Sequence, residues 1–447
     1  MVLVTPEARK AVLETMGCDH IRVAVVGNVD AGKSTMIGTI KTSTLDDGRG
    51  ASRSKIMKHQ HEIETGRTSC ISQHLVGLSA DGEVVASTNN ESEIAQQSAR
   101  VVSLMDLAGH EKYFKTTVRG LSMGMADYAV LMINSAQPPT VMTMHHLRLC
   151  AACGIPVIIV MTKVDSCPSQ VLQHSKRKIV DILRSKEFNK RQYAIKSEKD
   201  VETVQDKLHS LTPMLSVSFV AGEGVDLLKS LLFALPKRRH HERKIQRPFE
   251  FLIEEVFHVK GIGCVLSGFV NAGEYRKGEP LYVGPMKDGS YAKVTVRSMH
   301  VAQTDVDYTY AGHSACFAIS GLTKTQRTRL NRRKGFVCVT EKTVAAVRTL
   351  TADLVMLRGE PVTMTKGQFR ATAHVLNVKA CVKVSEIISS SSTVGNGSLV
   401  VLRPGDRARV QFQVVGPPVY VRKGMRIILR DGHVRAVGTI LETGAGR

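Results

Sequence analysis

The 447-residue sequence has no tryptophan, few aromatic residues and no long apolar run. Aromatic residues make up 5% of the chain, so stacking of unpaired bases is not expected to be its main way of contacting a nucleic acid. No stretch of about 18 apolar residues occurs, so no membrane-spanning helix is predicted. Charged residues interrupt the first twenty positions. These positions therefore lack the apolar core of a signal peptide and are predicted to form a short amphipathic helix.

Cysteine is also scarce, with nine residues scattered along the chain. This odd number, found mostly in apolar helical or strand-like contexts, is typical of reduced thiols and favours a cytoplasmic protein. Cys150 and Cys153 form a C-x-x-C pair. No second pair follows it, so we interpret the pair as helix core rather than as a metal site. The neighbouring His145 and His146 are expected on the helix surface.

Residues 27–34 read GNVDAGKS and fit the phosphate-loop pattern G-x-x-x-x-G-K-[ST]. An apolar stretch at 21–26 predicts a buried strand before the loop, and 35–41 predicts a helix start after it. This arrangement turns backbone N–H groups toward a polyphosphate. We expect Lys33 to reach the β- and γ-phosphates and the Ser34 hydroxyl to hold Mg²⁺. The loop residues predicted to bind the nucleotide are Asn28, Val29, Asp30, Ala31, Gly32, Lys33, Ser34 and Thr35.

A second predicted strand, at 101–104, runs into Asp106-Leu107-Ala108-Gly109-His110. A carboxylate at the end of a strand can support the Mg²⁺ shell through a water, so Asp106 is a predicted metal-site residue. Gly109 has no side chain in the way, which leaves its amide free to approach the γ-phosphate.

Two later segments indicate guanine as the base. A predicted strand at 155–161 ends at Thr162-Lys163-Val164-Asp165. The Asp165 carboxylate can accept two hydrogen bonds from guanine, a donor pair that adenine lacks, while the stem of Lys163 lies over the base. A predicted strand at 213–218 is followed by a turn beside the base, with Ser218 and Phe219 at its start. Four such segments, each at the carboxyl end of a predicted parallel strand, point together to a GTP/GDP site.

The alternation of predicted elements changes about halfway along the chain. The first half alternates strands and helices and predicts an α/β P-loop GTPase domain with a mostly parallel sheet. The second half has short strands punctuated by glycine, which predicts two all-β barrel domains. The predicted parts are an N-terminal helical extension (1–20), the GTP-binding domain (21–236), a basic linker (237–247), a first β-barrel (248–341) and a second β-barrel (346–447).

Three details of the GTP-binding domain are also predicted. Residues 42–69 are expected to be helical and polar and to form the first switch. Residues 70–86 are expected to form a hairpin that turns at Asp81-Gly82. The polar stretch 87–100 is expected to be a loop.

The motifs resemble those of the translational GTPases of the elongation factor Tu and elongation factor 1-alpha class, through GNVDAGKS and DLAGH. Longer strings resemble the GTP-binding protein 1 and 2 subfamily more closely: VAVVGNVDAGKSTMIGTI, LDDGRG, KHQHEIETGRTS, DLAGHEKYFKTTVRG and TKVDSCP. These strings cover the first half of the chain densely, whereas the second half matches by pattern.

The resemblance implies hydrolysis of GTP to GDP and phosphate, with Mg²⁺ as cofactor. In this reading His110 orients the attacking water, while Lys33 and the loop amides hold the phosphates. Thr68 in ETGRT would bind Mg²⁺ together with Ser34 and report the γ-phosphate. No arginine is placed convincingly to assist in cis, so we expect slow intrinsic turnover and activation by a partner, which in this family is the ribosome.

Three positions depart from the broader elongation factor pattern. Thr162 stands where asparagine is usual, so we expect weaker contacts to guanine and to the phosphate loop. Arg67 replaces an apolar residue that, with Val29, would shield the water-orienting histidine. Ala108 replaces a proline, which is expected to loosen the second switch. Asp165 remains, so guanine preference should survive.

The basic excess behind the net charge of +21 is spread along the chain, but it concentrates in the basic linker and in residues 324–334, which hold six cations and no acid. A solvated surface is one interpretation. An electrostatic footprint for structured RNA, such as tRNA or ribosomal RNA, is the favoured one.

Two function classes stay open. One is a translation factor that binds aminoacyl-tRNA, the ribosome or both in a GTP-dependent way. The other is a GTP-switched RNA adaptor for RNA decay or ribosome rescue. A GTPase subunit of sulfate activation is disfavoured by the basic charge. A guanine-nucleotide exchange factor is a further partner that the sequence leaves open.

Overall fold

The chain forms two compact units in the computed structural model, residues 19–239 and residues 1–18 with 240–447. The described residues are 5–18, 20–57, 72–85, 90–109, 117–118, 120–121, 126–332, 334–342, 344–357, 361–391 and 399–444. Within this part of the chain no helix is long and apolar enough to cross a membrane.

The unit of residues 19–239 is built on one eight-stranded sheet, in the order β3-β2-β4-β1-β5-β6-β8-β7. The strands from β4 to β7 along this order run parallel, while β2 and β3 pair antiparallel at one edge. The strands are β1 (His20–Gly27), β2 (Ser72–Leu78), β3 (Val84–Val85), β4 (Arg100–Asp106), β5 (Tyr128–Asn134), β6 (Val157–Thr162), β7 (Arg191–Ala194) and β8 (Leu211–Val217). The predicted mostly parallel α/β sheet is confirmed.

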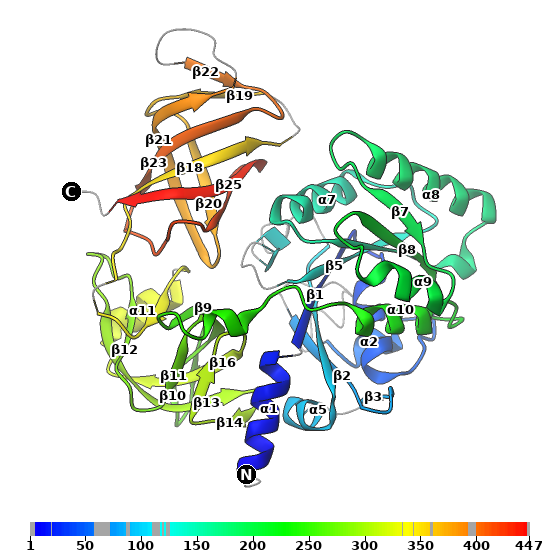
Figure 1. The fold of residues 1–447 in the computed structure, drawn as a ribbon, viewed down its shortest axis with the longest axis horizontal. Helices are drawn as coiled ribbons and strands as arrows, with labels where there is room; N and C mark the ends of the chain where they lie inside the picture. The colour runs from blue at the N-terminus through cyan, green and yellow to red at the C-terminus, as the bar shows by residue number, and fades with distance from the viewer. Residues whose placement is uncertain are drawn as a thin grey trace. The chain divides into compact units, whose positions relative to one another are not determined.

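Helices cover both faces of this sheet. They are α2 (Lys33–Thr42), α3 (Ala51–Ser54), α5 (Glu91–Gln97), α7 (Val141–Cys153), α8 (Ser169–Arg184), α9 (Glu198–Gln205) and α10 (Val225–Ala234), with a 3-10 turn η2 at Val164–Ser166. Figure 1 shows α7 and α8 on one face and α9 and α10 on the other. Because both faces are covered, β5 and β6 are almost entirely apolar, and every residue of β1 is buried, including His20 and Arg22.

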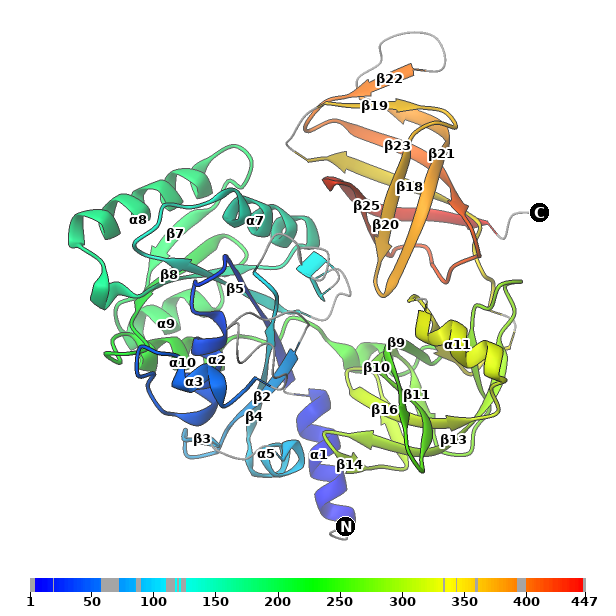
Figure 2. The same ribbon diagram turned by 180° about the vertical axis from the view of Figure 1, so that it is seen from behind.

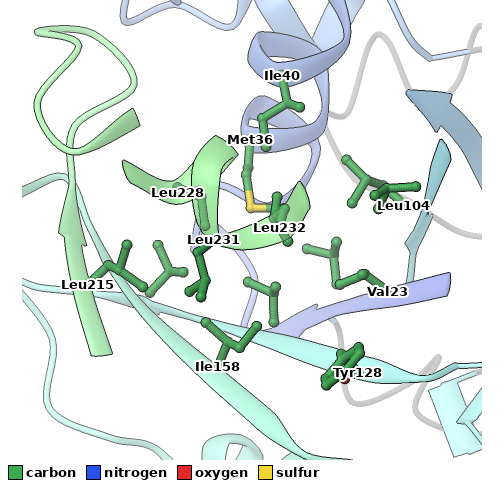
Figure 3. Close-up of a cluster of buried hydrophobic side chains, with 14 of the residues drawn as sticks. Val23, Met36, Ile40, Leu104, Tyr128, Ile158, Leu215, Leu228, Leu231 and Leu232 are labelled. Carbon is green, nitrogen blue, oxygen red and sulfur yellow. The ribbon is translucent and has the colours of Figure 1, made fainter. Parts of the chain in front are cut away.

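The core between the sheet and α2 and α10 is shown in Figure 3. Met36 and Ile40 of α2 meet Leu228 and Leu232 of α10 over Val23 of β1, and all five are buried. Burying side chains of this size stabilises the domain by about 1.5–3 kcal/mol each. The same packing fixes the loops at the carboxyl ends of β1, β6 and β8.

Three local predictions for this unit were wrong. Residues 43–50 form a loop rather than a helix and α3 is only four residues long, while residues 58–69 of the same prediction lie outside the described residues. The stretch 87–100, predicted as a loop, contains α5, which Asn90 caps by accepting a hydrogen bond from the Ser92 amide. His146 lies fully buried rather than on the helix surface, because α7 turns this position inward. The predicted hairpin is present as β2 and β3, with Gly82 in a left-handed conformation.

The second unit contains two β-barrels, seen from both sides in Figures 1 and 2. In the first, the order β12-β17-β9-β10-β16-β13 is closed by pairing of β12 with β13. Its elements are β9 (Glu250–Val259), β10 (Gly263–Ala272), β11 (Glu274–Arg276), β12 (Leu281–Gly284), β13 (Ala292–Val301), β14 (Thr304–Asp305), β15 (Tyr308–Tyr310), β16 (Ser314–Ser320), α11 (Lys324–Arg332) and β17 (Val337–Val339). Stacked rings of Phe251 and Phe317, with centroids 4.4 Å apart, lie in its core.

The second barrel closes in the order β18-β23-β21-β20-β24-β25. Its strands are β18 (Thr349–Met356), β19 (Val362–Thr365), β20 (Arg370–Val375), β21 (Val378–Ser390), β22 (Leu399–Leu402), β23 (Arg407–Val415), β24 (Arg426–Asp431) and β25 (His433–Gly444). The prediction of two all-β barrels after the GTPase domain is therefore confirmed.

The N-terminal helix α1 (Pro6–Cys18) precedes β1 in sequence but packs on the first barrel. The carbonyl oxygen of Leu13 accepts a hydrogen bond from the Tyr310 hydroxyl at 2.8 Å and lies 2.9 Å from Nε2 of His313. Since a carbonyl only accepts, Nε2 carries the proton. Val12, Leu13 and Met16 are buried by this docking.

Candidate nucleotide site

The phosphate loop joins β1 to α2 and is shaped by two left-handed residues. Asp30 has φ 59° and Gly32 has φ 85°, directly before α2 begins at Lys33. A non-glycine residue in this region is strained by about 1–3 kcal/mol and is typical of functional loops. The side chain of Asn28 accepts a hydrogen bond from the Val29 amide at 2.9 Å. The strand, loop and helix therefore follow one another as the motif predicts.

Lys33 is buried, with only 8% of its surface exposed. Its Nζ donates a hydrogen bond to the Asn28 carbonyl oxygen at 2.8 Å, back across the loop. Burial lowers the pKa of this ammonium, and the nearby carboxylates of Asp106 and Asp30 partly oppose that shift. A cation with so little water around it interacts strongly with an incoming anion.

Ser34 and Asp106 meet at the centre of the site. The Ser34 hydroxyl donates to Oδ2 of Asp106 at 2.6 Å. Asp106 ends β4, which lies parallel to β1 with Val25 opposite Asp106, and this register brings the carboxylate beside the phosphate loop. Hydroxyl and carboxylate oxygens are the ligands that Mg²⁺ prefers, so the donor set fits that ion. In the part of the chain that the structure describes, no group of three His, Cys, Asp or Glu residues could hold a metal.

Gly109 lies directly against the phosphate loop. A Cβ atom added to it would fall 2.6 Å from the Gly27 carbonyl oxygen and would also contact Nζ of Lys33. Only glycine allows this approach. The preceding residue, Ala108, has its carbonyl oxygen bound by the buried Thr117 hydroxyl at 2.9 Å.

On the base side, Thr162 ends β6 and is fully buried. Its hydroxyl lies 3.0 Å from the Ala31 carbonyl oxygen and 3.2 Å from that of Ile133, and these two acceptors share its single proton. A contact to the phosphate loop is therefore present despite the shorter side chain, although its strength stays a prediction. Lys163 follows in a left-handed conformation, with φ 58°. Asp165 is exposed in η2, and its role in binding guanine stays a prediction.

The loop after β8 is closed by its own hydrogen bonds. The Ser218 amide donates to the Glu223 carbonyl oxygen at 2.9 Å, and the Ser218 hydroxyl accepts from the Ala221 amide at 3.0 Å. Ser218 is fully buried and Phe219 is nearly so. These bonds hold the end of β8 in the position where the sequence predicts one wall of the base site.

Sequence reasoning missed Asp46. Its carboxylate accepts from the amides of Gly48, Gly50 and Ser52, the shortest at 2.9 Å. Its own amide donates to the Phe219 carbonyl oxygen at 2.9 Å. Asp46 therefore folds the start of the predicted first switch and ties it to the base-side loop. The DDG sequence at this point is typical of a turn in which aspartate accepts from the following amides, and that signal could have identified it.

Two predicted residues, Thr68 and His110, lie outside the described residues, as does Arg67. Their proposed roles stay predictions. The remaining predicted residues converge at the carboxyl ends of β1, β4, β6 and β8. His146, on α7, has its pKa lowered to about 3, first by burial and next by the positive charge of Lys33.

This sheet, its phosphate loop and the two barrels define the class of P-loop GTPases with translation-factor architecture. The model of the elongation factor Tu GTP binding domain matches residues 18–237. GTP-binding protein 1 of Xenopus laevis is 34% identical over 430 residues, covering 94% of this chain and 63% of that protein. GTP-binding protein 2 of Mus musculus is 32% identical over 433 residues, covering 95% and 69%. The chain belongs to the translational GTPase family, in the group of GTP-binding proteins 1 and 2.

Solved structures share the fold at lower identity. A bacterial selenocysteine-specific elongation factor aligns with TM-score 0.65 and 18% identity, covering 94% of this chain and 58% of that one. The S. cerevisiae Ski7 GTPase-like domain, bound to GDP and inorganic phosphate, aligns with TM-score 0.70 and 15% identity, covering 95% and 98%. The chain spans 63% of the length of the Xenopus relative.

Proposed function

We propose that this chain hydrolyses GTP and uses the bound nucleotide to control its hold on structured RNA and the ribosome. The observation that supports the proposal is that several residues of the predicted nucleotide site surround the ammonium group of Lys33. Its buried ammonium lies between the Asn28 carbonyl and Gly109, with Ser34 and Asp106 alongside. A polyphosphate entering the loop would take over the interaction that the Asn28 carbonyl now makes.

The chain's own residues then act by positioning and charge. Lys33 would neutralise charge on the β- and γ-phosphates, and the amides of the phosphate loop would orient them. Ser34 would coordinate Mg²⁺ directly, while Asp106 would hold one of its waters. The ion would neutralise negative charge that develops on the phosphates. Gly109 stands close enough to the loop for its amide to contact a γ-phosphate.

Two further roles rest on the motif rather than on geometry. His110 follows Gly109 and is the proposed residue for orienting the attacking water. Thr68 is the proposed second Mg²⁺ ligand and sensor of the γ-phosphate. With no arginine assigned in cis, we expect slow intrinsic hydrolysis and stimulation by the ribosome.

Support for an RNA partner comes from charge. The chain carries +21, and α11 alone presents the exposed cations Lys324, Arg327 and Arg332. Contacts of this kind to RNA phosphates are strong at low salt. They weaken as the salt concentration rises, because the release of counterions from the RNA then gains less free energy. The cysteine pattern supports a cytoplasmic location for such a protein.

The second candidate is a GTP-switched RNA adaptor that recruits decay or rescue machinery without carrying aminoacyl-tRNA. Both candidates share the nucleotide site and differ in the RNA that the GTP form prefers.

The test is binding of aminoacyl-tRNA and deacylated tRNA to the GTP-analogue and GDP forms at two salt concentrations. A delivery factor binds only in the GTP form and prefers the aminoacylated RNA. Binding that depends on the bound nucleotide but not on aminoacylation of the tRNA favours the adaptor. Binding that depends on neither the nucleotide nor aminoacylation, and only weakens as the salt concentration rises, contradicts nucleotide control.

A further inference from the structure

A second cavity lies on the same edge of the sheet as the nucleotide site. It has a volume of about 670 Å³ and is lined by residues of α8, by Gln192 and Ala194 of β7, by Met214 and Ser216 of β8, and by Glu223 and Gly224. In open α/β sheets, ligands bind outside the carboxyl ends of the strands. None of the residues predicted to bind GTP lines this cavity, so it is a separate site.

Four cations surround this basic pocket: Lys176, Arg177, Arg184 and Lys196. The first three lie on α8, where Arg177 and Arg184 are seven residues, or about two turns, apart and share one helical face. Lys196 comes from the opposite wall, directly after β7 and Ile195. Two carboxylates, Asp181 and Glu223, line the pocket as well, which leaves an excess of positive charge.

These cations make no ion pair within 4.0 Å among the residues that the structure describes. Elsewhere in the same domain, cations near carboxylates do pair. Nε of Arg148 donates to Oε1 of Glu187 at 2.7 Å, and Nε of Arg239 lies 3.3 Å from Oδ1 of Asp127. The charge on the basic pocket is therefore left available to a ligand.

Lys176 and Lys196 are close enough to repel one another. Burial lowers the pKa of Lys176 most, the charge of Lys196 lowers it further, and Glu223 partly offsets the two. Two ammonium groups held near each other in a concave surface create a local positive potential. A compact anion between them would relieve that repulsion.

We propose that the basic pocket binds a ligand through two or more phosphate groups held between Lys176 and Lys196. The guanidinium groups of Arg177 and Arg184 add planar donors that match phosphate oxygens. Its floor includes the apolar side chains of Val180, Ile195 and Leu227, which suits the sugar or base of a nucleotide unit. The phosphates come either from an RNA backbone or from a free polyphosphorylated nucleotide. Phosphate binding here does not rest on GTP hydrolysis.

The test compares two double variants of the full chain saturated with GDP. K176Q/K196Q removes the facing ammonium groups, and K178Q/K186Q removes the same charge from exposed positions outside the pocket. Binding is measured by titration with inorganic tripolyphosphate and with a short labelled single-stranded RNA. GDP affinity and thermal melting are measured for wild type and both double variants, to check that the fold and the nucleotide site are intact.

We expect K176Q/K196Q to weaken binding of at least one probe about tenfold, that is by about 1.4 kcal/mol, while K178Q/K186Q stays within about twofold of the wild type. For RNA, the slope of log affinity against log salt should fall by about 1.4, for two lost phosphate contacts. Loss for RNA alone assigns the phosphates to RNA, and loss for tripolyphosphate alone assigns them to a small molecule.

Three results overturn the proposal. The first is equal weakening in both double variants, which would mean that only total charge matters. The second is no weakening in K176Q/K196Q. The third is binding of a polyglutamate peptide to wild type as tightly as the phosphate probes, with an equal loss of that binding in K176Q/K196Q. This result would make the pocket a site for an acidic protein.

Discussion

The phosphate side and the base side of the nucleotide site are held in different ways. On the phosphate side, the charged groups of Lys33 and Asp106 are buried around one short loop. On the base side, the neutral side chains of Thr162 and Ser218 bind backbone groups, Thr162 in the phosphate loop and Ser218 within its own loop. The phosphate side joins Ser34 to Asp106, 72 positions apart, and the base side joins Thr162 to Ala31, 131 positions apart. We therefore expect charge to supply the affinity for phosphate, and neutral hydrogen bonds to supply the shape of the base site.

Removal of the Lys33 ammonium is the strongest challenge to this comparison. We expect Lys33→Ala to weaken GDP and GTP binding at least about a hundredfold, or about 2.7 kcal/mol, because no other described cation occupies the phosphate loop. Fluorescence titration with a labelled nucleotide measures this. Lys41→Ala, at the other end of α2, is the matched control and should stay near wild type. A Lys33→Ala protein that binds within about threefold of wild type would contradict a charge-based phosphate side.

Acid should expose the cost of burying His146 near Lys33. Burial lowers the pKa of His146 from its ordinary value of 6.5 to about 3 in the folded protein. Below pH 6.5 the unfolded state therefore binds more protons than the folded state. The contribution of the neutral His146 to the free energy of unfolding is complete above pH 6.5. It is lost as the pH falls, by up to about 1.4 kcal/mol per pH unit.

Urea unfolding at pH 7 and pH 5 measures this difference. The wild type should lose about 2 kcal/mol more over that interval than His146→Leu does. His174→Leu, at an exposed position of α8, is the control and should keep the wild-type slope. Identical pH slopes for wild type and His146→Leu would show that this histidine is not held neutral.

On the base side, Asp46→Ala should leave the amides of Gly48, Gly50 and Ser52 without their acceptor. We expect a loss of about 1.5 kcal/mol in the free energy of unfolding and faster release of GDP, because the start of the first switch is tied to the Phe219 loop. Asp47→Ala is the matched control. Its carboxylate also accepts two amides but is exposed, so the effect should be smaller. A larger effect from Asp47→Ala would refute the assigned role.

Thr162→Val tests the smallest of these effects. It removes the hydroxyl that reaches the Ala31 and Ile133 carbonyl oxygens while keeping the side-chain volume. We expect GDP affinity to fall about fivefold, or about 1 kcal/mol, and Thr162→Ser to retain most of it. Equal affinities for Thr162→Val and wild type would show that the hydrogen bond from Thr162 to the phosphate loop does not shape the base site. Isothermal titration distinguishes these results.

The nucleotide site was predictable to the extent that its chemistry is local. Apolar runs identified β1, β4, β6 and β8, since strands buried on both faces leave little choice of residue. The phosphate loop followed from glycine spacing. The contact between Asp46 and Phe219 was missed because the two residues are 173 positions apart, and no periodicity reports such a pair.

Other errors have the same cause. His146 was placed on the surface because α7 is apolar nearly all round, so its inner face could not be recognised from sequence. The N-terminal helix was predicted, but its docking on the first barrel depends on Tyr310 and His313, about 300 residues away. The basic run at 324–334 was recognised by charge, yet α11 forms there with only Leu330 buried.

Single-turnover hydrolysis of GTP, with wild type and Lys33→Ala compared in the presence and absence of ribosomes, tests the central claim most directly. The account predicts slow phosphate release by wild type alone, acceleration by ribosomes, and loss of both in Lys33→Ala. Phosphate release that is equal in wild type and Lys33→Ala, or absent from wild type under every condition while GTP stays bound, would contradict it.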